Sequence, residues 1–442
     1  MRRSSRVTRR RFLAAAAGSA AAAVAGAPYF VPARALGRDG AIAPSNRIAT
    51  GHIGVGGRGS GLLNSFLGLS EVQSVAVADV DVRHRERAAG VIEKKYADQA
   101  AAGAFKGTQT YNDFRELIER SDVDALVMAV PDHWHAVLAC AALRAGKDIY
   151  TEKPLSLTVP DGRAVVETAN RFGRVVQVGS HERSRSNARY AAELVRSGYI
   201  GKLHTIHVNM PVDNHGPIPP QPVMPVPDGF DYNMWLGPAP WAPYTEKRCH
   251  FHFRYILDYS GGEMTDRGAH IIDLAQLGHG SDDTGPVEVW GDGWAPEDGL
   301  FNTFMKYKFG FRYADGVQVL GESVGPRGIK YVGDKGWIFV YIHGGNLEAS
   351  DPRLLQIALK PDDVHLGRSP GHHQDFIECV KTRKRPFATA EIGHRTATMC
   401  HIANIAMLLK RKLQWDPAAE RFINDDAANH MLDRPMREPW RV

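Results

Sequence analysis

Residues 48–59 read IATGHIGVGGRG, and this stretch decides how the first part of the chain folds. A short apolar run is followed by glycines with G-x-G-x-x-G spacing, which is typical of a dinucleotide-binding turn between a strand and a helix. The glycines permit a tight turn and let the backbone approach a pyrophosphate, whose charge the N-terminus of the next helix meets. The cofactor contacts predicted here are Gly54, Gly56, Gly57, Arg58 and Gly59.

The next apolar run ends in a carboxylate at the position such a site requires. The run SVAVADVD contains Asp79, which lies 25 positions after Gly54. An aspartate there accepts hydrogen bonds from the adenosine ribose and repels a 2′-phosphate. We therefore expect NAD as the cofactor, with NADP possible through Arg83. The alternative, a glycine-rich turn without function, is less favoured, because the strand, the helix and Asp79 occur in the required order.

Residues 46–179 continue the same alternation of short apolar runs and helix-forming segments. The runs DALVMAV, DIYTE and VVQVGS are separated by stretches such as 82–96 and 136–144 that favour helix. Strands that alternate with helices predict an α/β fold, with a doubly wound parallel sheet of Rossmann type. We assign residues 46–179 to an NAD(P)-binding domain.

Residues 180–442 have a different pattern. Residues 211–243 are rich in proline and aromatic side chains, and the apolar runs within 287–320 and 336–341 have no helical stretch between them. This predicts an α+β domain with a large, open, mostly antiparallel sheet. Late helices are expected at about 373–384 and 391–412, covering either that sheet or the first domain.

Residues 1–38 have the layout of an export signal. They contain eight arginines and no carboxylate, and an uncharged stretch runs from 12 to 33. Thr8-Arg9-Arg10-Arg11-Phe12-Leu13 resembles a twin-arginine motif, and ten of residues 14–27 are alanine. We expect the export machinery for folded proteins as a partner and a periplasmic location. The alternative is an uncleaved leader that tethers the protein to the membrane.

Charge and cysteine content exclude other classes. The formal net charge is +5, but without the eight arginines of the leader the remaining chain is net negative, so no nucleic-acid partner is expected. Cys140, Cys249, Cys379 and Cys400 are far apart and form no C-x-x-C pair. Buried free thiols are favoured, with a late disulfide as the alternative.

A lysine follows the strand at 148–151. Thr151-Glu152-Lys153-Pro154 lies at the carboxyl end of that strand, where open parallel sheets bind ligands. Pro154 favours an extended backbone at Lys153, which would present the ammonium group beside a nicotinamide. On this evidence alone, a solvated loop lysine is equally acceptable.

Several motifs together resemble the glucose-fructose oxidoreductase, inositol dehydrogenase and rhizopine-catabolism (Gfo/Idh/MocA) family. They are the glycine motif, Pro131-Asp132-His133-Trp134-His135, Ala145-Gly146-Lys147 and Glu152-Lys153-Pro154, with later similarity at 235–238, 261–273 and 333–337. The resemblance implies a Rossmann domain followed by an α/β domain whose open sheet packs subunits together, so a homo-oligomer is expected. It also implies cofactor contacts at Pro131, His135, Glu152 and Lys153.

The segment GEMTDRGAHIID carries the remaining catalytic candidates. Asp266 and His270 are four residues apart, and Asp273 lies three further, so on a helix they share one face. The resemblance implies that Lys153 acts with Asp266 and His270; the alternative is a capped helix with a buried structural histidine. We assign His270 as general acid/base, Asp266 as its orienter or a substrate acceptor, and Lys153 as the cation that stabilises an alkoxide, although Lys153 and His270 could exchange roles.

Further substrate contacts are expected at Asp273, Trp235 and His373, where an aromatic face or a polar group could meet a sugar. Packing of a long loop explains the aromatic residues equally well. No metal is expected, because the adjacent His372 and His373 would point apart and the cysteines are unpaired.

These observations predict an NAD(P)-dependent oxidoreductase that acts on a secondary alcohol of a sugar, sugar derivative or cyclitol. Export of a folded protein suggests a tightly bound cofactor, which must then be restored within the catalytic cycle. A redox-neutral glycosidase or epimerase that works through a transient keto-sugar is the alternative. A binding or scaffold protein with a vestigial site is a third class.

Overall fold

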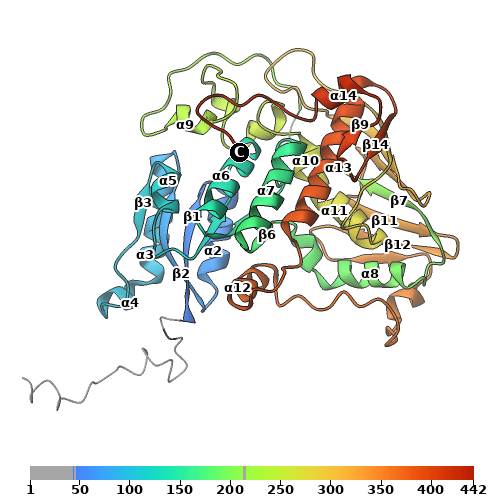
Figure 1. Ribbon diagram of the computed structural model, residues 1–442, viewed down its shortest axis with the longest axis horizontal. Helices are drawn as coiled ribbons and strands as arrows, with labels where there is room; N and C mark the ends of the chain where they lie inside the picture. The colour runs from blue at the N-terminus through green and yellow to red at the C-terminus, as the bar shows by residue number, and fades with distance from the viewer. Residues whose placement is uncertain (1–42, 44–45, 213–215) are drawn as a thin grey trace, which may run out of the picture. The chain divides into compact units, whose positions relative to one another are not determined.

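The computed structural model describes residues 43, 46–212 and 216–442, so the predicted leader at 1–38 lies outside the described residues. From Ile48 onward, the chain begins with a parallel six-stranded sheet of order β3-β2-β1-β4-β5-β6 (Figure 1). The order reverses direction beside β1, as in doubly wound dinucleotide-binding sheets. The expected Rossmann fold is therefore confirmed. The strands are β1 (Ile48–Ile53), β2 (Val72–Ala78), β3 (Gln109–Tyr111), β4 (Ala125–Met128), β5 (Asp148–Thr151) and β6 (Val176–Val178).

Helices cover both faces of this sheet. Because β4 is buried along its whole length, its sequence ALVM is a continuous apolar run instead of an alternating pattern. The helix expected at 82–96 is α3, and the one expected at 136–144 begins four residues earlier, at Asp132. The helices are α2 (Gly57–Leu67), α3 (Val82–Lys95), α4 (Ala97–Ala101), α5 (Phe114–Ile118), α6 (Asp132–Arg144) and α7 (Val159–Phe172).

The glycine turn between β1 and α2 is required by its surroundings. Gly54 has φ +75°, and a Cβ there would lie 2.5 Å from the carbonyl oxygen of Ala129. A Cβ at Gly59 would overlap the carbonyl oxygen of Gly54, so Gly59 is what lets α2 pack against the end of β1. No side chain caps the start of α2 at Gly57, which leaves backbone N–H groups free to meet a ligand.

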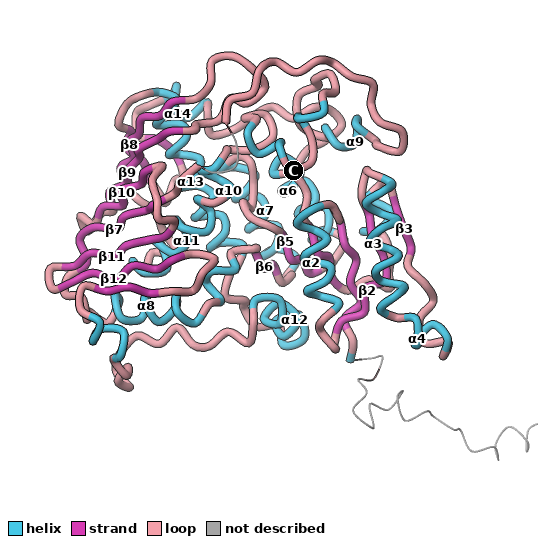
Figure 2. The backbone as a smooth tube through the Cα atoms, turned by 180° about the vertical axis from the view of Figure 1, so that it is seen from behind, coloured by secondary structure: helices cyan, strands magenta, loops and turns pink. Residues whose placement is uncertain are grey.

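The second sheet has nine strands in the order β13-β12-β11-β7-β10-β9-β8-β14-β15 (Figure 2). All of its neighbouring strands pair antiparallel except β7 and β10, which are parallel. The expected open, mostly antiparallel sheet is confirmed. The strands are β7 (Leu203–Asn209), β8 (Glu288–Trp294), β9 (Lys306–Arg312), β10 (Gln318–Glu322), β11 (Gly328–Gly333), β12 (Gly336–Tyr341), β13 (Leu347–Ala349), β14 (Leu413–Asp416) and β15 (Arg421–Phe422).

The two late helices cover different partners. α12 packs against the first sheet, where Phe376 meets Phe66 and Tyr150 edge-on. α13 contacts α7 on one side and β8 on the other, so it joins the two domains (Figure 1). Because it is enclosed on nearly all sides, its apolar residues show no single stripe. The helices of this part are α8 (Ser186–Arg196), α9 (Tyr232–Leu236), α10 (Glu263–Asp266), α11 (Gly268–His279), α12 (His372–Thr382), α13 (Ala390–Leu409) and α14 (Asp426–His430), with short 3-10 turns η3 (His181–Ser184), η4 (Glu246–Arg248), η5 (His252–Tyr255) and η6 (Pro352–Gln356).

Two further features of the described residues concern the cysteines and the length of the apolar helices. All four cysteines are buried free thiols, as favoured above. In the described part of the chain, no helix is both long and apolar enough to cross a bilayer.

Candidate active site

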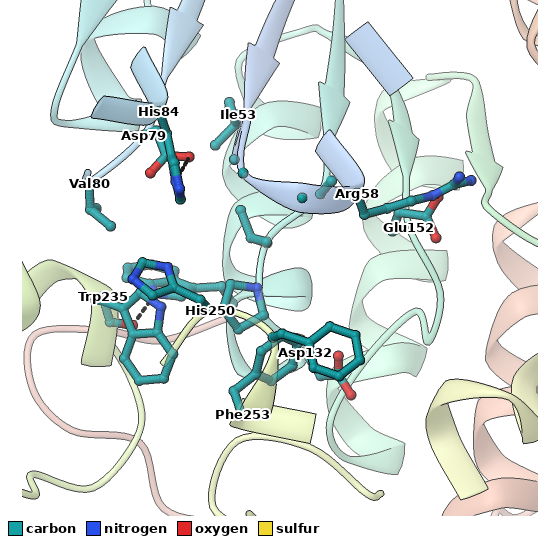
Figure 3. A pocket seen from close by; sticks show the side chains of 18 of the residues that line it. Ile53, Arg58, Asp79, Val80, His84, Asp132, Glu152, Trp235, His250 and Phe253 are labelled. Carbon is teal, nitrogen blue, oxygen red and sulfur yellow. Dashed lines mark hydrogen bonds and ion pairs between the residues drawn. The ribbon is translucent and has the colours of Figure 1, made fainter. Parts of the chain in front are cut away.

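A cavity of about 640 Å³ lies at the carboxyl ends of the parallel strands and is roofed by the second domain (Figure 3). Its volume is in the usual range for small-molecule sites. The Rossmann domain contributes the glycine turn and the residues that follow β2, β4 and β5. The second domain contributes residues from the segment 230–270 and from the turn after β12. The predicted site residues that line it are Gly54, Gly56, Gly57, Arg58, Asp79, Pro131, Glu152, Lys153, Trp235, Asp266 and His270.

Asp79 marks one end of the cavity. Its carboxylate accepts hydrogen bonds from the backbone N–H groups of Val55 (2.8 Å) and Asp81 (2.9 Å), and His84 Nδ1 lies 3.4 Å away (Figure 3). The side chain is thus fixed at the end of β2, where an adenosine ribose is bound in such folds. Arg83 forms a two-point ion pair with Asp81 and is not among the residues that line the cavity.

Lys153 lies at the centre of the cavity wall and is held by the second domain. Its ammonium donates to the Asp266 carboxylate and, at 2.9 Å, to the Asp266 carbonyl oxygen. Arg254 Nε lies 3.5 Å from the other carboxylate oxygen. Burial opposes ionisation of Asp266, but Lys153 and Arg254 outweigh it and hold the pKa of Asp266 well below its usual range. Asp266 therefore stays an anion that positions the lysine.

His270 lies one helical turn beyond Asp266, at the start of α11. Burial, followed by the nearby charge of Lys153, holds the pKa of His270 well below its ordinary value. The imidazole is therefore neutral at physiological pH and can accept a proton. Its Nδ1 has no hydrogen-bond partner among the described residues. The structure thus brings Lys153, Asp266 and His270 to one cavity from two domains.

Asp132 connects the Rossmann domain to the second domain. It is buried at the start of α6 and accepts a hydrogen bond from Ser260 Oγ at 2.6 Å. Ser260 belongs to the loop that leads into Gly261-Gly262 and α10, on which Asp266 is carried. The Asp132 carboxylate therefore ties the Rossmann domain to the segment that carries the catalytic candidates.

The segment 229–256, here called the cover segment, lies across the Asp79 end of the cavity. The Val82 N–H donates to the Gly229 carbonyl and the Asp231 N–H to the Val80 carbonyl, both at 2.9 Å. Asn112 Nδ2 donates to Asp231 at 2.8 Å. These bonds fix the cover segment to the residues after β2 and β3, so a nucleotide in the cavity would be enclosed by two domains. The cover-segment residues that line the cavity are Phe230, Met234, Trp235, His250, Phe251, Phe253 and Arg254.

Four predicted contacts do not line the cavity, and one of them is Gly59, whose role is the packing of α2 against the end of β1. Asp273 is fully buried, and its two carboxylate oxygens share the Arg183 Nε–H at 2.8 Å each, so it stabilises α11 and does not face the cavity. His373 packs against Phe66 and Tyr150 and does not line the cavity. His135 lies outside the cavity lining as well.

The ring nitrogens of His135 explain its position. Both face backbone carbonyl oxygens, those of Val130 and Pro154. The side chain therefore braces the loops after β4 and β5, from which Pro131 and Lys153 enter the cavity, and does not itself present a polar group to a ligand.

Sequence reasoning missed several cavity residues, including His181, His343 and Arg254. His181 follows the last parallel strand, β6, so the rule that ligands bind at carboxyl ends of strands could have found it. His343 lies in a turn between β12 and β13 and Arg254 in η5. Nothing in the sequence distinguished these two from ordinary loop residues.

The fold and the cavity define a class: a two-domain dinucleotide-binding protein with an ion-paired lysine and a neutral histidine beside the cofactor crevice. Residues 48–180 match the family description "Oxidoreductase family, NAD-binding Rossmann fold", and residues 218–442 match "Oxidoreductase family, C-terminal alpha/beta domain". The chain belongs to the Gfo/Idh/MocA oxidoreductase family, and its cofactor is NAD.

Curated relatives match part of the chain. The alpha-N-acetylgalactosaminidase of Shewanella oneidensis is 30% identical over 167 residues, which are 37% of this chain and 35% of that protein. A glycosyl hydrolase family 109 protein of Shewanella pealeana is 28% identical over 156 residues, which are 35% of this chain and 33% of that protein. The matches thus span about a third of the length of these relatives.

Solved structures match over most of the described chain. The aldose-aldose oxidoreductase of Caulobacter crescentus complexed with glycerol has a TM-score of 0.61 at 18% identity, covering 83% of this chain and 99% of that one. The WlbA dehydrogenase of Bordetella pertussis in complex with NADH and UDP-GlcNAcA has a TM-score of 0.58 at 16% identity, covering 84% and 99%. At these identities, the likeness demonstrates a shared fold.

Proposed function

We propose that this protein transfers hydride between a secondary alcohol of a sugar, sugar derivative or cyclitol and NAD. The observation that carries the proposal is the convergence of Lys153, Asp266 and His270 on one cavity with Asp79 and the glycine turn. The printed names of the relatives and neighbours, which include sugar-acting enzymes, support the substrate class.

The side chains suit the proton chemistry that such a transfer needs. NAD, when bound, supplies the hydride acceptor. His270, neutral because of its low pKa, takes the proton of the substrate hydroxyl. Lys153, held by Asp266, donates a hydrogen bond to the oxygen on which negative charge develops. Trp235 offers an apolar ring on the cavity wall for the C–H face of a sugar.

A redox-neutral glycosidase that works through a transient keto-sugar is the second candidate. The bonds of the cover segment to the residues after β2 and β3 favour it, because they would help to hold a nucleotide in place, and a nucleotide that is not exchanged must be restored in each cycle. The partial matches to an alpha-N-acetylgalactosaminidase and to glycosyl hydrolase family 109 support the same reaction class.

One experiment separates these two functions. Purified protein is incubated with a panel of aryl glycosides and free sugars, and aglycone release and NADH absorbance are followed together. Aglycone without net NADH supports the glycosidase, whereas a keto-sugar matched by NADH supports the dehydrogenase. Absence of both across the panel, with NAD bound and no epimeric sugar formed, would favour a binding protein.

The Lys153→Ala variant tests the mechanism. We expect turnover to fall by about 10³-fold or more, since the alkoxide loses its cation, while NAD affinity changes little. Lys306→Ala, which removes an exposed lysine from β9, is the matched control. Undiminished turnover in Lys153→Ala would exclude the proposed role.

We further propose export to the periplasm by the twin-arginine route and assembly as a homo-oligomer through the nine-stranded sheet. The arginine-rich residues 1–38 support the first proposal. Fractionation of cells that express the full chain, with Arg9 and Arg10 both replaced by Lys as control, tests export. Light scattering of the purified protein tests assembly.

A further inference from the structure

Three side chains from two distant segments meet beside the cavity, and two of them, His181 and His343, line it. His181 and Glu182 lie in η3, after β6, and His343 lies in the turn after β12. Glu182 Oε1 is 3.1 Å from His181 Nε2 and 3.3 Å from His343 Nδ1. Ligand atoms that share a tetrahedral ion at about 2.0–2.2 Å are about 3.3–3.5 Å apart. Both printed distances are close to that spacing, and all three ligand atoms lie within 4.8 Å of one another.

Hydrogen bonding alone explains this arrangement poorly. Glu182 is 1% exposed, and its Oε1 also faces Arg185 Nε at 3.1 Å and the His343 backbone N–H at 3.3 Å. Its other oxygen, Oε2, is buried without a partner among the described residues. Four donors thus crowd one oxygen while its twin has none, although leaving a buried acceptor unpaired costs about 1–3 kcal/mol. A cation held between the carboxylate and the two ring nitrogens could engage Oε2 as well as Oε1, and both imidazoles would then act as acceptors.

The backbone at His343 supports a functional reason for this geometry. His343 has φ +62°, a left-handed conformation that a residue with a Cβ seldom adopts. In this conformation its N–H points at Glu182 while its ring lines the cavity. Strained residues of this kind cluster at ligand sites, because the surrounding structure must hold them there.

We propose that His181, Glu182 and His343 bind one divalent transition-metal ion, with Zn²⁺ as the best match, on the wall of the active-site cavity. Two imidazoles and one carboxylate are a common ligand set of zinc sites that keep one position open. Arg185 and the His343 N–H, which hold Glu182, would then be outer-shell partners.

The open position would face the cavity beside the proposed base. The His270 ring centre is 4.5 Å from that of His181 and 5.6 Å from that of His343. A hydroxyl or carbonyl oxygen of the substrate could therefore bind the ion while remaining within reach of His270. The site goes beyond the proposed hydride transfer, because metal binding does not require turnover.

A second group of possible ligands, Asp81, His84 and His250, does not support the same inference. Both oxygens of Asp81 are already engaged by Arg83. His84 lies against Asp79, at the end of the cavity that the adenosine ribose needs. An ion there would compete with the cofactor.

Zinc stoichiometry tests the proposal directly. The full-length protein is dialysed against a chelator, incubated with Zn²⁺ in slight excess, passed through gel filtration and analysed by mass spectrometry of the metal. We expect about one zinc per chain. In His343→Ala, a variant that removes a partly exposed ring, affinity should fall by about 100-fold or more, since even outer-shell partners contribute about 10- to 100-fold. His204→Ala, which removes an exposed histidine of β7, should bind zinc normally.

The visible absorption of bound Co²⁺ is a second readout. It would not change if His343 had only a structural role. Co²⁺ in place of Zn²⁺ should give the visible absorption of a low-coordinate site in the parent protein and in His204→Ala, and none in His343→Ala. The proposal is overturned if the parent retains no zinc, or if parent and His343→Ala retain it equally. Because neither readout involves a substrate, these results are independent of the proposed function.

Discussion

At the scale of single residues, the site depends on pairs that fix each other's charge. Lys153 would be a mobile loop ammonium without Asp266, which comes from the other domain and binds it through two oxygens. His270 in turn remains neutral because it is buried and has the lysine beside it. One cation and one neutral base in the same cavity are what alcohol oxidation requires.

Asp79→Asn should weaken NAD binding and reduce selectivity against NADP. The amide retains the shape and can still accept the Val55 N–H through its oxygen, but it loses the charge that the ribose hydroxyls meet. We expect NAD affinity to fall by about tenfold, which corresponds to about 1.4 kcal/mol. Titration calorimetry with both nucleotides measures the change. An unchanged ratio of NAD to NADP affinity would contradict the assignment of Asp79 to the ribose.

Asp273→Asn separates a structural carboxylate from a catalytic one. Asp273 is fully buried on Arg183, so its removal leaves the guanidinium with only Asp282 as an anionic partner. We expect the free energy of unfolding to fall by about 3 kcal/mol, at the lower end of the range for a broken buried pair. Denaturant titration checks this expectation, and a KM within about twofold of the parent would fit a position outside the cavity. A large rise in KM with unchanged stability would restore Asp273 as a substrate contact.

At the scale of elements, the carboxyl ends of β1, β2, β4, β5 and β6 bring the cofactor and substrate groups together, because parallel strands all end at the same edge of the sheet. α13 then fixes the second sheet to the first by packing between α7 and β8. An ion-pair network at its N-terminal half reinforces this contact. Its members are Arg163, Glu391, His394, Arg395 and Glu420.

The pH dependence of stability should report on this network. Burial opposes ionisation of Glu420, but hydrogen bonds from His394 and Arg163 outweigh it and lower the pKa of Glu420 from 4.5 to about 2. The stabilisation it provides is therefore present above pH 4.5 and is lost as the pH falls from 4.5 toward 2.

Glu420→Gln should lower the free energy of unfolding at neutral pH. It should also make that free energy depend less on pH between pH 4.5 and the lowest pH at which the protein stays folded. Denaturant unfolding at a series of pH values tests this expectation. Glu297→Gln, at an exposed loop position, is the control and should follow the parent. If the free energy of unfolding changes with pH in the same way in Glu420→Gln and in the parent, the proposed contribution of Glu420 is contradicted.

At the scale of the whole molecule, the cover segment makes one site from two domains. Its bonds to the residues after β2 and β3 close the adenosine end of the crevice. A bound nucleotide would therefore lie between the Rossmann domain and the cover segment at this end of the cavity. This gives the expectation of a retained cofactor a structural basis that does not depend on the export signal.

Gly229→Ala should loosen this closure. Gly229 has φ +76°, and a Cβ there would overlap Val82, so the cover segment must move away. We expect NAD to dissociate about tenfold faster or more, equivalent to losing about 1.4 kcal/mol of the contact. Stopped-flow displacement measures the rate.

Gly316→Ala is the matched control. Gly316 also has a positive φ, +93°, but a Cβ there would meet nothing within 4 Å. The control therefore shares the backbone strain without the clash, and its NAD dissociation should equal that of the parent. Equal dissociation rates in all three proteins would show that the cover segment does not retain the nucleotide.

The sequence by itself determined what depends on local pattern. The glycine turn, the alternation of apolar runs with helices, and the strand at 336–341 each follow from short-range backbone and packing requirements, and the structure reproduces them. The spacing of Asp266 and His270 predicts that both lie on one side of a helix; in the structure Asp266 ends α10, His270 lies in α11, and both line the cavity. Asp79 at the end of β2 belongs to the same class of inference.

Only the tertiary structure decided which side chains from remote segments meet. Glu182 and His343 are 161 positions apart, and their contact requires the turn after β12 to return to the end of β6. Asp273 has the helical spacing of a site residue, but its carboxylate is buried in an ion pair with Arg183. Periodicity fixes the face of a helix on which a residue lies, whereas the partner on that face is chosen by the packing of the whole chain.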